Sequence, residues 1–429
     1  MKPRIHIYLP ALLLACLSAD SQKISKTDKI LLANLQTHIR SLSADTAGGR
    51  AMGSPGEKAT GDYVISELSK TGARPKGDHN GWLQTFTINE GRQIADNALF
   101  TVDERALATG KDWFPLSLSP AGEVAGSPAI ALQESGVPWF QDLKEWLETA
   151  ADDPHFDLMG MIRDKAAACG KKGATALILY NSSARFDKDK LGFDPKDKAE
   201  PAAIPVLYIT HEAKRKFLKD ESASVDIRIR IAYTEKERTG NNVVAFLDNG
   251  APTTVMIGAR YDNSSGLAGM IELARLLSAS KLISNNYLFI VFSGSGLDWP
   301  GSAYYTGHPA IDLKRVNYLL ELDQLGTLND ATHALTIGGY NTSAAWTTIG
   351  NSVRDRKALS IHFDSSAARP GDHTAFYRQK VPVLVFSTGT GSANDPNDPA
   401  NCQGEMQVVK YIYSLIEAAD TRGRLLSSE

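Results

Sequence analysis

Cysteine is scarce in this 429-residue chain, which contains only Cys16, Cys169 and Cys402. So few cysteines cannot build the disulfide framework of a small secreted domain, and none of them stands at the spacing of a zinc site. Cys169 lies in the helical pattern AAACGKKGA. We therefore expect it to be a small buried apolar residue.

The chain also lacks a strong charge of either sign, because its net charge is −3 at pH 7. It has no stripe of interleaved basic and aromatic residues, so we expect no nucleic-acid partner. Internal repeats and low-complexity tracts are absent as well. The hydrophobic content of 42% and charged content of 22% are typical of a globular protein. The length allows two or three domains with well-formed cores.

The apolar run near the start is too short to span a bilayer; it follows Lys2 and Arg4 and ends at Cys16. This pattern predicts an exported protein with a signal peptide in residues 1–19. The letters LLAC at 13–16 resemble a bacterial lipobox, whose cysteine becomes the lipidated amino terminus. We expect a periplasmic or outer-membrane lipoprotein that contacts the membrane only through this lipid. The alternative is a secreted protein whose signal is cut after Cys16.

The chain is organised around residues 255–277, VMIGARYDNSSGLAGMIELARLL. Its first three residues form the apolar run of a buried strand, and later apolar residues recur at the three- and four-residue spacing of a helix. Asp262 or Asn263 is expected to cap that helix. Ligands bind outside the carboxyl ends of strands in open α/β sheets, so we expect functional residues in the loop at 258–266.

This stretch resembles the zinc aminopeptidases of metallopeptidase family 28, especially secreted bacterial members with a protease-associated domain. The family has G-A-H-x-D on the strand and D-D-N-A-S-G at the helix, where this chain has GAR and DNSSG. Two later segments, NYLLELDQLGTLND and GDHTAFYRQKVPVLVFSTG, resemble N-Y-x-x-N-x-D-M-x-G-R-L-N-D and S-D-H-T-x-F-Y-R-x-x-I-P-V-L-F-F-x-T-G. The similarity covers nearly all of the chain after the first two dozen residues.

The resemblance implies an α/β fold, a three-layer αβα hydrolase-like mixed sheet with an inserted β-rich protease-associated domain. We expect residues 20–96 and 233–429 to form the peptidase-like domain and residues 97–232 to form the insert. The insert contains the strand-like GEVAGSPAIAL and IPVLYI and the helix-then-strand pattern MIRDKAAACGKKGATALILYN. No chemistry of its own is expected there.

Five positions match metal ligands of the family, and only Asp323 and His373 keep a ligand type. Arg260 replaces the first histidine, Tyr261 the bridging carboxylate and Gly296 a ligand glutamate, while Ser295 replaces the general base. A catalytic zinc usually takes three protein ligands, and arginine cannot coordinate because it stays protonated. We therefore expect no cofactor; zinc would bind only if Asp262 or Asp298 supplied missing ligands.

Arg260 has a second possible role, which is to supply the positive charge that the metals supply in the family. We expect it to pair with Asp323 or Asp262 in a partly buried pocket, since an unpaired carboxylate there would cost several kcal/mol. If the pocket binds a ligand, the Arg260 charge favours a carboxylate such as a peptide end. Further pocket contacts are expected from Asp262, Asn263, Asp298 and Asp372. Arg50 and Glu57 are expected to be solvated loop charges.

Three functions follow from these residues. The first is that of an inactive homologue, a pseudo-peptidase that binds peptides or a partner protein. The sequence leaves its oligomeric state open. Alternatively, it is an active metallo-exopeptidase with a rearranged zinc site. The third possibility is a metal-free hydrolase in which Ser295 is the nucleophile, with His373 and Asp323 as partners. The nucleophile elbow G-x-S-x-G has a glycine two residues before the serine, and Ser295 lacks it. We favour the first, because the base and three of the five ligand positions are altered together.

Overall fold

The computed structural model describes residues 25–43, 49–153, 155–183, 191–197, 200–353, 358–364, 370–389 and 401–428. They form two compact units: unit 1 runs up to Phe86 and resumes at Gly240, and unit 2 is Thr87–Thr239. The chain passes between the units inside two long strands, β2 (Leu83–Ile94) and β11 (Tyr233–Leu247). The expected insert, residues 97–232, falls within unit 2. Cys16 and the expected signal peptide lie outside the described residues.

Unit 1 is built on a nine-stranded mixed sheet, in which β2 pairs with β11. The order of the other strands is β1 (Arg74–Pro75), β11, β13 (Asn285–Phe292), β12 (Thr253–Arg260), β14 (Val316–Leu322), β17 (Val383–Ser387), β15 (Ala334–Gly338) and β16 (Ser360–Phe363). Strands β13, β12, β14 and β17 are parallel, so their carboxyl ends meet at one edge. Every residue of β13 and β14 is buried, as expected for strands covered on both faces.

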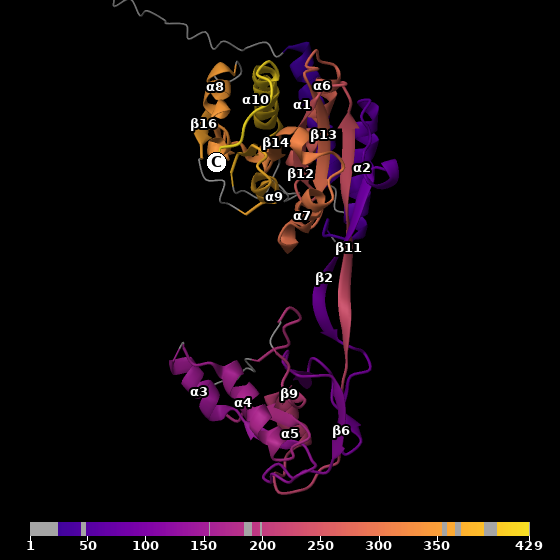
Figure 1. Cartoon of the computed structure of the whole chain (residues 1–429), viewed down its shortest axis with the longest axis vertical. Coiled ribbons are helices and arrows are strands. Elements are labelled where there is room, and N and C mark those ends of the chain that lie inside the picture. The colour runs from indigo at the N-terminus through magenta and orange to yellow at the C-terminus, as the bar shows by residue number, and fades with distance from the viewer. Residues whose placement is uncertain are drawn as a thin grey trace, which may run out of the picture. The chain divides into compact units, whose positions relative to one another are not determined.

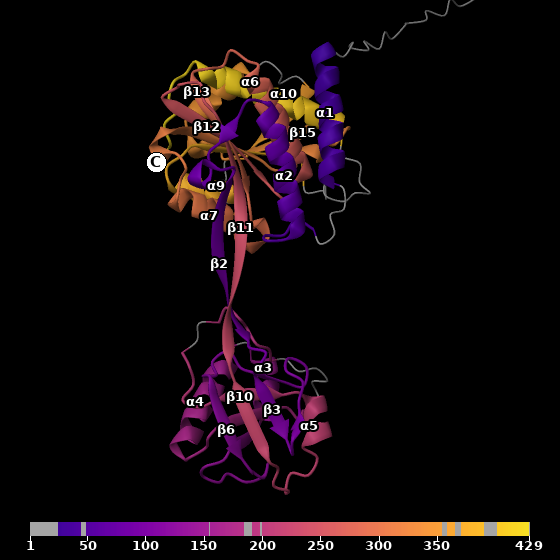
Figure 2. The ribbon, with the colours of Figure 1, turned by 90° about the vertical axis from the view of Figure 1, so that its right-hand side faces the viewer.

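Helices cover both faces of this sheet (Figures 1 and 2). One face packs against α1 (Lys26–Ser43), α2 (Pro55–Lys70), α6 (Ser264–Ser278), α8 (Ala345–Ser352) and α10 (Cys402–Asp420). The other packs against α7 (Pro300–Gly307) and α9 (Asp372–Arg378). Unit 1 is therefore the three-layer α/β/α sandwich with a mixed sheet that the sequence predicts.

The central strand-to-helix turn is confirmed, with the cap at the second of the two expected residues. The Asn263 side chain accepts a hydrogen bond from the Gly266 amide at 2.9 Å, so it satisfies one of the amides that the first turn of α6 leaves free. At Gly266 a Cβ would lie 2.4 Å from the Leu322 carbonyl oxygen. The helix can approach β14 this closely only because that residue is glycine.

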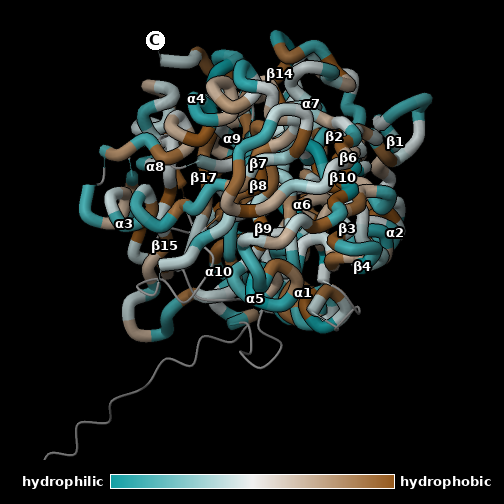
Figure 3. Tube along the Cα trace, turned by 90° about the horizontal axis from the view of Figure 1, so that it is seen from below, coloured by the Kyte–Doolittle hydropathy of each residue, from teal (hydrophilic) through white to brown (hydrophobic). Residues whose placement is uncertain are grey.

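Unit 2 contains two four-stranded sheets with their own apolar cores. One has the order β4 (Arg105–Ala106), β3 (Leu99–Val102), β10 (Ile227–Ile231) and β6 (Gly122–Gly126), and the other β5 (Trp113–Pro115), β9 (Val206–Ile209), β8 (Leu177–Tyr180) and β7 (Trp139–Asp142). Its helices include α3 (Lys144–Asp152), α4 (Leu158–Lys171) and α5 (His211–Phe217). Strands β8 and β9 are buried along their whole length, and Figure 3 colours this part of the chain as hydrophobic. Cys169 is buried on α4, as expected.

Helices that could act as membrane spans were sought through the described part of the chain, and none has the length and apolar character required.

Candidate functional site

Alternation along β12 determines where the residues at its carboxyl end point. One set of its side chains packs into the core beneath α1 and α6: Val255, Ile257 and Ala259. Met256 packs on the opposite face, beneath α7 and α9. Because successive side chains point to opposite faces, Arg260 emerges on the α7 and α9 face. Tyr261 turns into the core beneath α1 and α6, where its side chain is 3% exposed and its hydroxyl lies against Gly61 of α2.

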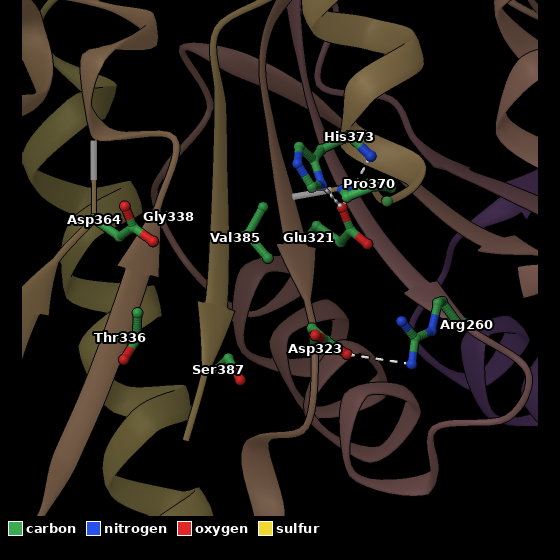
Figure 4. Close-up of a pocket in the computed structure, with 11 residues that line it drawn as sticks. Arg260, Glu321, Asp323, Thr336, Gly338, Asp364, Pro370, His373, Val385 and Ser387 are labelled. Atoms are coloured by element: carbon green, nitrogen blue, oxygen red, sulfur yellow. Dashed lines mark hydrogen bonds and ion pairs between the residues drawn. The ribbon is translucent and has the colours of Figure 1, made fainter. Parts of the chain in front are cut away.

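The Arg260 guanidinium lies between two carboxylates. Its Nε donates to Asp262 Oδ1 at 3.1 Å, and its Nη2 is 3.3 Å from Asp323 Oδ1 (Figure 4). The side chain of Arg260 is 21% exposed, against 45% for Asp262 and 30% for Asp323. Burial lowers the pKa of Arg260, but the charges of Asp262, Asp323 and Glu321 outweigh it, so its pKa is raised and the cation is retained. Both partners considered in the sequence analysis are therefore used.

Asp262 is the centre of a wider set of polar contacts. Ser295 Oγ donates to its Oδ2 at 2.8 Å, and Arg50 Nη2 donates to its backbone carbonyl at 3.4 Å. Ser295 thus directs its proton to a carboxylate that is already paired with Arg260. This contact does not join Ser295 to His373, which a serine triad would require.

His373 lies at the start of α9 and pairs with a carboxylate that the sequence analysis did not select, Glu321. Glu321 Oε2 accepts hydrogen bonds from the His373 backbone amide at 2.9 Å and from its Nδ1 at 2.7 Å. Burial raises the pKa of Glu321, but these hydrogen bonds and the His373 charge outweigh it and the pKa is lowered. The fully buried neighbour Asp372 has its pKa raised to about 8 by burial and by the Glu321 charge. Asp372 is therefore a neutral acid near pH 7.

The remaining predicted site residues lie in three different settings. Asn263 caps α6 and also directs its Nδ2 to Asp323 Oδ1 at 3.4 Å. Gly296 is exposed, and a Cβ added there would meet nothing within 4 Å. Asp298 is exposed with a left-handed φ of 62°. Tyr261 is absent from the lining of the cavity described below, and so are all four expected pocket contacts: Asp262, Asn263, Asp298 and Asp372.

The expectation that Arg50 and Glu57 are solvated loop charges is wrong. The Glu57 side chain is 3% exposed and accepts hydrogen bonds from Ser293 Oγ and from the Gly53 amide. Burial raises the pKa of Glu57 despite these bonds. Arg50 lies on the chain that leads into α2 and Glu57 lies in the first turn of α2, and both contact residues just beyond the carboxyl ends of β12 and β13. Their sequence gives no sign of this, because the contacts span more than 200 residues.

A cavity of about 130 Å³ adjoins Arg260 (Figure 4). Its walls come from β14, β15 and β17, from the end of β12 and β16, and from the start of α9. The side chains that face it include Arg260, Asp323, His373, Thr336, Asp364 and Ser387. Thr336, Asp364 and Ser387 were not selected from the sequence. The available signal was the period of two, which places Ser387 and Thr336 on the same sheet face as Asp323.

Two zinc ions, which the resemblance implies, do not fit these residues. A permanently protonated guanidinium lies within 3.3 Å of Asp323, and one Glu321 oxygen is bonded to His373 Nδ1. Tyr261 points away into the core, so it brings no donor. Throughout the described ranges, no group of three or more His, Cys, Asp or Glu side chains has an arrangement that could hold a metal.

Comparison with known proteins finds a family match for part of the chain. Residues 238–403, about two fifths of the chain, match the model of peptidase family M28. Among solved structures, an aminopeptidase from Aneurinibacillus sp. strain AM-1 is 18% identical, with a TM-score of 0.49 and 93% and 95% of the two chains covered. A zinc aminopeptidase from Bacillus subtilis is 17% identical, with a TM-score of 0.48, and the match covers 90% of this chain and 94% of that chain.

Curated relatives are similar over a larger part of the sequence. The probable leucine aminopeptidase 2 of Aspergillus oryzae is 25% identical over 66% of this chain and 56% of its own length. Aminopeptidase YwaD of Bacillus subtilis is 26% identical over 53% of this chain and 50% of its own length. The probable lipoprotein aminopeptidase LpqL of Mycobacterium tuberculosis is 24% identical over 70% of this chain and 59% of its own length. The matches span only about half of the length of these relatives. With its mixed α/β sheet and the family match over residues 238–403, this chain is a homologue of the aminopeptidases of peptidase family M28.

Proposed function

We propose that this protein is a pseudo-peptidase, an M28 homologue that binds peptides without hydrolysing them. The observation that carries the proposal is Arg260 paired with both Asp262 and Asp323. A guanidinium in that place repels a divalent cation and already neutralises the carboxylates that would attract one. Ser295 in turn cannot act as the carboxylate base, and a positioned base contributes roughly 10²–10⁴-fold in rate.

Metal content is the direct test. The purified protein, dialysed against micromolar zinc and then desalted, should retain less than about 0.1 zinc ion per chain by elemental analysis. Aminopeptidase YwaD, prepared in the same way, serves as the positive control for hydrolysis of aminoacyl anilides. One or two zinc ions per chain together with turnover comparable to the control would favour the active metallo-exopeptidase instead.

A serine-directed probe tests the metal-free alternative. Because Ser295 donates to a carboxylate paired with Arg260, we expect no covalent labelling by a fluorophosphonate. Labelling that a Ser295→Ala variant abolishes would support the serine hydrolase.

The cavity lies at the carboxyl ends of parallel strands, where open α/β sheets bind ligands, and the similarity to aminopeptidases supports a peptide as the ligand. The carboxylate ligand expected from the Arg260 charge is not favoured by the contacts, because Asp262 and Asp323 already occupy that guanidinium. Isothermal titration with short peptides carrying free or blocked ends would identify the end that binds. An Arg260→Ala variant with unchanged affinity would exclude a direct contact.

We also propose that the protein is an exported lipoprotein anchored through Cys16, which lies outside the described residues. The lipobox-like letters at 13–16 carry this proposal, and a relative at 24% identity is named a probable lipoprotein aminopeptidase. In a bacterial host, the chain should fractionate with membranes and incorporate labelled palmitate. A Cys16→Ser variant that remained in the membrane fraction would contradict the anchor.

A further inference from the structure

A groove lies at the edge of the unit 1 sheet opposite to Arg260. It adjoins the amino ends of β14 and β17, whose carboxyl ends border the cavity described above, and its volume is about 420 Å³. Because β14 is seven residues long, the groove and the cavity are about 23 Å apart along the strand. Ligand pockets in proteins measure about 300–1,000 Å³. The groove therefore reaches the size of a ligand site, which the cavity beside Arg260 does not.

The groove is bordered by three segments of the chain: residues 309–316, 379–382 and 424–427. Its apolar residues include Val316, Val381 and Leu425, which are 1%, 2% and 5% exposed and so belong to the packed interior. Leu426 also lines the groove, and its side chain is 77% exposed. The groove thus offers an apolar surface on which a ligand can bury an apolar group.

Each of the three segments also contributes a cation: Lys314, Lys380 and Arg424. Their side chains form no ion pair with any carboxylate of the described ranges. Among the described residues of the groove, Asp312 alone carries a carboxylate, and its Oδ1 accepts a hydrogen bond from the Lys314 amide at 2.9 Å. The groove therefore has a surplus of positive charge in a chain whose net charge is −3.

The backbone on both sides of Arg424 is fixed by one buried side chain. Asn317 is 1% exposed; its Nδ2 donates to the Gly423 carbonyl at 3.1 Å, and its Oδ1 accepts from the Leu425 amide at 2.7 Å. A guanidinium matches the two oxygens of a carboxylate. Because the backbone that carries this guanidinium is already ordered, less conformational entropy is lost when a ligand binds.

Lys380 occupies a position that is usually glycine. The Lys380 amide donates to the Tyr377 carbonyl at 2.9 Å and the Val381 amide to the Phe376 carbonyl at 3.2 Å, which is the Schellman pattern at the end of α9. Lys380 has a left-handed φ of 62°, a conformation that side chains other than glycine adopt only at a cost in free energy. A lysine at this position therefore weakens the turn, and its charge faces the groove that two other cations line.

We propose that this groove binds an acidic peptide segment of a partner protein. Carboxylates of the segment pair with Lys314, Lys380 and Arg424, and one of its apolar side chains packs against Val316 and Val381. Single-stranded nucleic acid is less suited to the groove, because its bases stack on aromatic side chains and none of the described lining residues is aromatic. The inference is independent of peptide binding at the Arg260 cavity.

Matched peptides test the groove. A fluorescein-labelled peptide with blocked ends and the sequence Glu-Glu-Leu-Glu-Glu would be titrated with the full chain and followed by fluorescence anisotropy. We expect a Gln-Gln-Leu-Gln-Gln peptide to bind at least about tenfold more weakly, which corresponds to about 1.4 kcal/mol. A Glu-Glu-Ser-Glu-Glu peptide should lose the apolar contact and bind more weakly as well. Raising the salt concentration from about 0.05 M to about 0.5 M should weaken binding of the acidic peptide, since salt screens exposed charges.

Two variants locate the binding to the groove. Lys380→Gly and Arg424→Gln should each weaken binding of the acidic peptide at least threefold. Lys380→Gly should also raise the urea midpoint of unfolding, because glycine adopts the left-handed conformation without strain. Weaker binding by a more stable protein cannot result from unfolding. Lys29→Gln is the matched control, because Lys29 is exposed on α1 and does not line the groove, and its binding should be unchanged.

Each possible failure has a distinct meaning. Equal affinity for the glutamate and glutamine peptides would overturn the preference for an acidic segment. Unchanged affinity in both Lys380→Gly and Arg424→Gln would overturn the assignment to the groove, as would loss of binding in an Arg260→Ala variant. Tighter binding of a single-stranded oligonucleotide than of the acidic peptide would overturn the choice of partner. None of these results bears on the zinc content and hydrolysis that test the proposed function.

Discussion

Arg260 shows, at the scale of a single residue, how partial burial sets the strength of an ion pair. Fully exposed pairs contribute about 0–1 kcal/mol, whereas removing one member of a fully buried pair costs about 3–5 kcal/mol. Arg260 is 21% exposed, and its partners Asp262 and Asp323 are 45% and 30% exposed. Its removal should therefore cost an intermediate amount, because water reaches the carboxylates only in part.

An Arg260→Met variant should be less stable than the native protein by roughly 1–3 kcal/mol. Urea unfolding would measure the difference. Arg230→Met is the matched control, because Arg230 pairs with Glu123 at 2.7 Å while the two side chains are 47% and 70% exposed. The control should lose less than about 1 kcal/mol. Equal losses in the two variants would contradict a structural role for the Arg260 pair.

Glu405 is a second informative residue, in the first turn of α10. Its side chain is 0% exposed, and neither carboxylate oxygen has a hydrogen-bond partner within the described part of the chain. Burial raises the pKa of Glu405 well above 4.5. The helix amino terminus favours an anion by only about 0.3–1 kcal/mol, less than the several kcal/mol of burying an unpaired charge. The acid is therefore buried in its neutral form.

Because the folded pKa of Glu405 is raised, its contribution to stability is complete below about pH 4.5 and falls as pH rises towards the folded pKa. A Glu405→Gln variant should escape this loss. Its free energy of unfolding relative to the native protein should therefore increase by more than about 1 kcal/mol between pH 5 and pH 7. Urea titrations at both values would measure it.

Glu417→Gln, on the partly exposed side of the same helix, controls for the loss of an acidic residue. A constant difference between Glu405→Gln and the native protein across this pH range would show that Glu405 is solvated.

At this scale the sequence predicted the site residues that lie in segments resembling the family. It missed the residues whose role depends on a contact with a residue far away in the sequence. Arg260, Asp323 and His373 were placed because their neighbours match the family. Glu321 was missed although it lies two residues before Asp323, because its partner His373 is 52 residues away. Glu57 was assigned to solvent for the same reason, since its partner Ser293 is 236 residues away.

At the scale of elements, α1 is held to α6 by a buried polar contact as well as by apolar packing. Glu272 of α6 is 1% exposed and accepts hydrogen bonds from Asn34 of α1 at 3.1 Å and from Arg275 at 2.7–3.1 Å, with His38 of α1 3.5 Å away. Burial raises the pKa of Glu272, but hydrogen bonds from His38, Arg275 and Asn34 outweigh it and the pKa is lowered. The carboxylate is thus charged and fully paired.

A Glu272→Gln variant should be less stable by roughly 2–4 kcal/mol, since it leaves Arg275 without its buried counter-charge. The loss should be largest near neutral pH and shrink in acid, because a group with a lowered pKa stabilises above its unfolded pKa and ceases to do so as pH falls. Thermal and urea unfolding would measure it. Asp62→Asn, which removes the exposed pair with Lys58 on α2, should cost less than about 1 kcal/mol.

The sequence predicted most elements of unit 1, because their apolar patterns are long and periodic. The periodic apolar residues of 406–419 lie in α10 (Cys402–Asp420), and the apolar run at 287–292 lies in β13 (Asn285–Phe292). The apolar alternation at 82–88 and 242–247 covers only part of two strands, since β2 and β11 continue as far as Ile94 and back to Tyr233. Their extra residues are mostly polar or charged, so the apolar alternation ended before the strands did.

At the scale of the whole molecule, the two long strands explain why the chain divides where it does. Thr87 Oγ1 and Thr239 Oγ1 are 3.2 Å apart, so the chain leaves unit 1 and returns to it at neighbouring points. The boundaries expected for the insert, 97 and 232, lie inside unit 2, because they fall close to the start of β3 and the end of β10 and leave out the parts of β2 and β11 that belong to unit 2.

Replacing residues 87–239 by Asn-Gly should therefore join the two strands in a hairpin and leave unit 1 folded. Unit 2 alone should also fold, because it has two sheets with their own cores. Each piece should show a single cooperative transition in urea, followed by near-ultraviolet circular dichroism. Loss of cooperative unfolding in both pieces would show that the units depend on one another.

The buried side chain of Tyr261 limits which residues can replace it. An acidic residue at that position would remove an aromatic ring from the core and bury an unpaired carboxylate in its place, a combined cost of several kcal/mol against a total stability of about 5–15 kcal/mol. A single Tyr261→Asp substitution would therefore destabilise unit 1 by a large part of its total stability. The core beneath α1 and α6 thus accepts an acidic residue at 261 only if the packing against Gly61 of α2 changes with it.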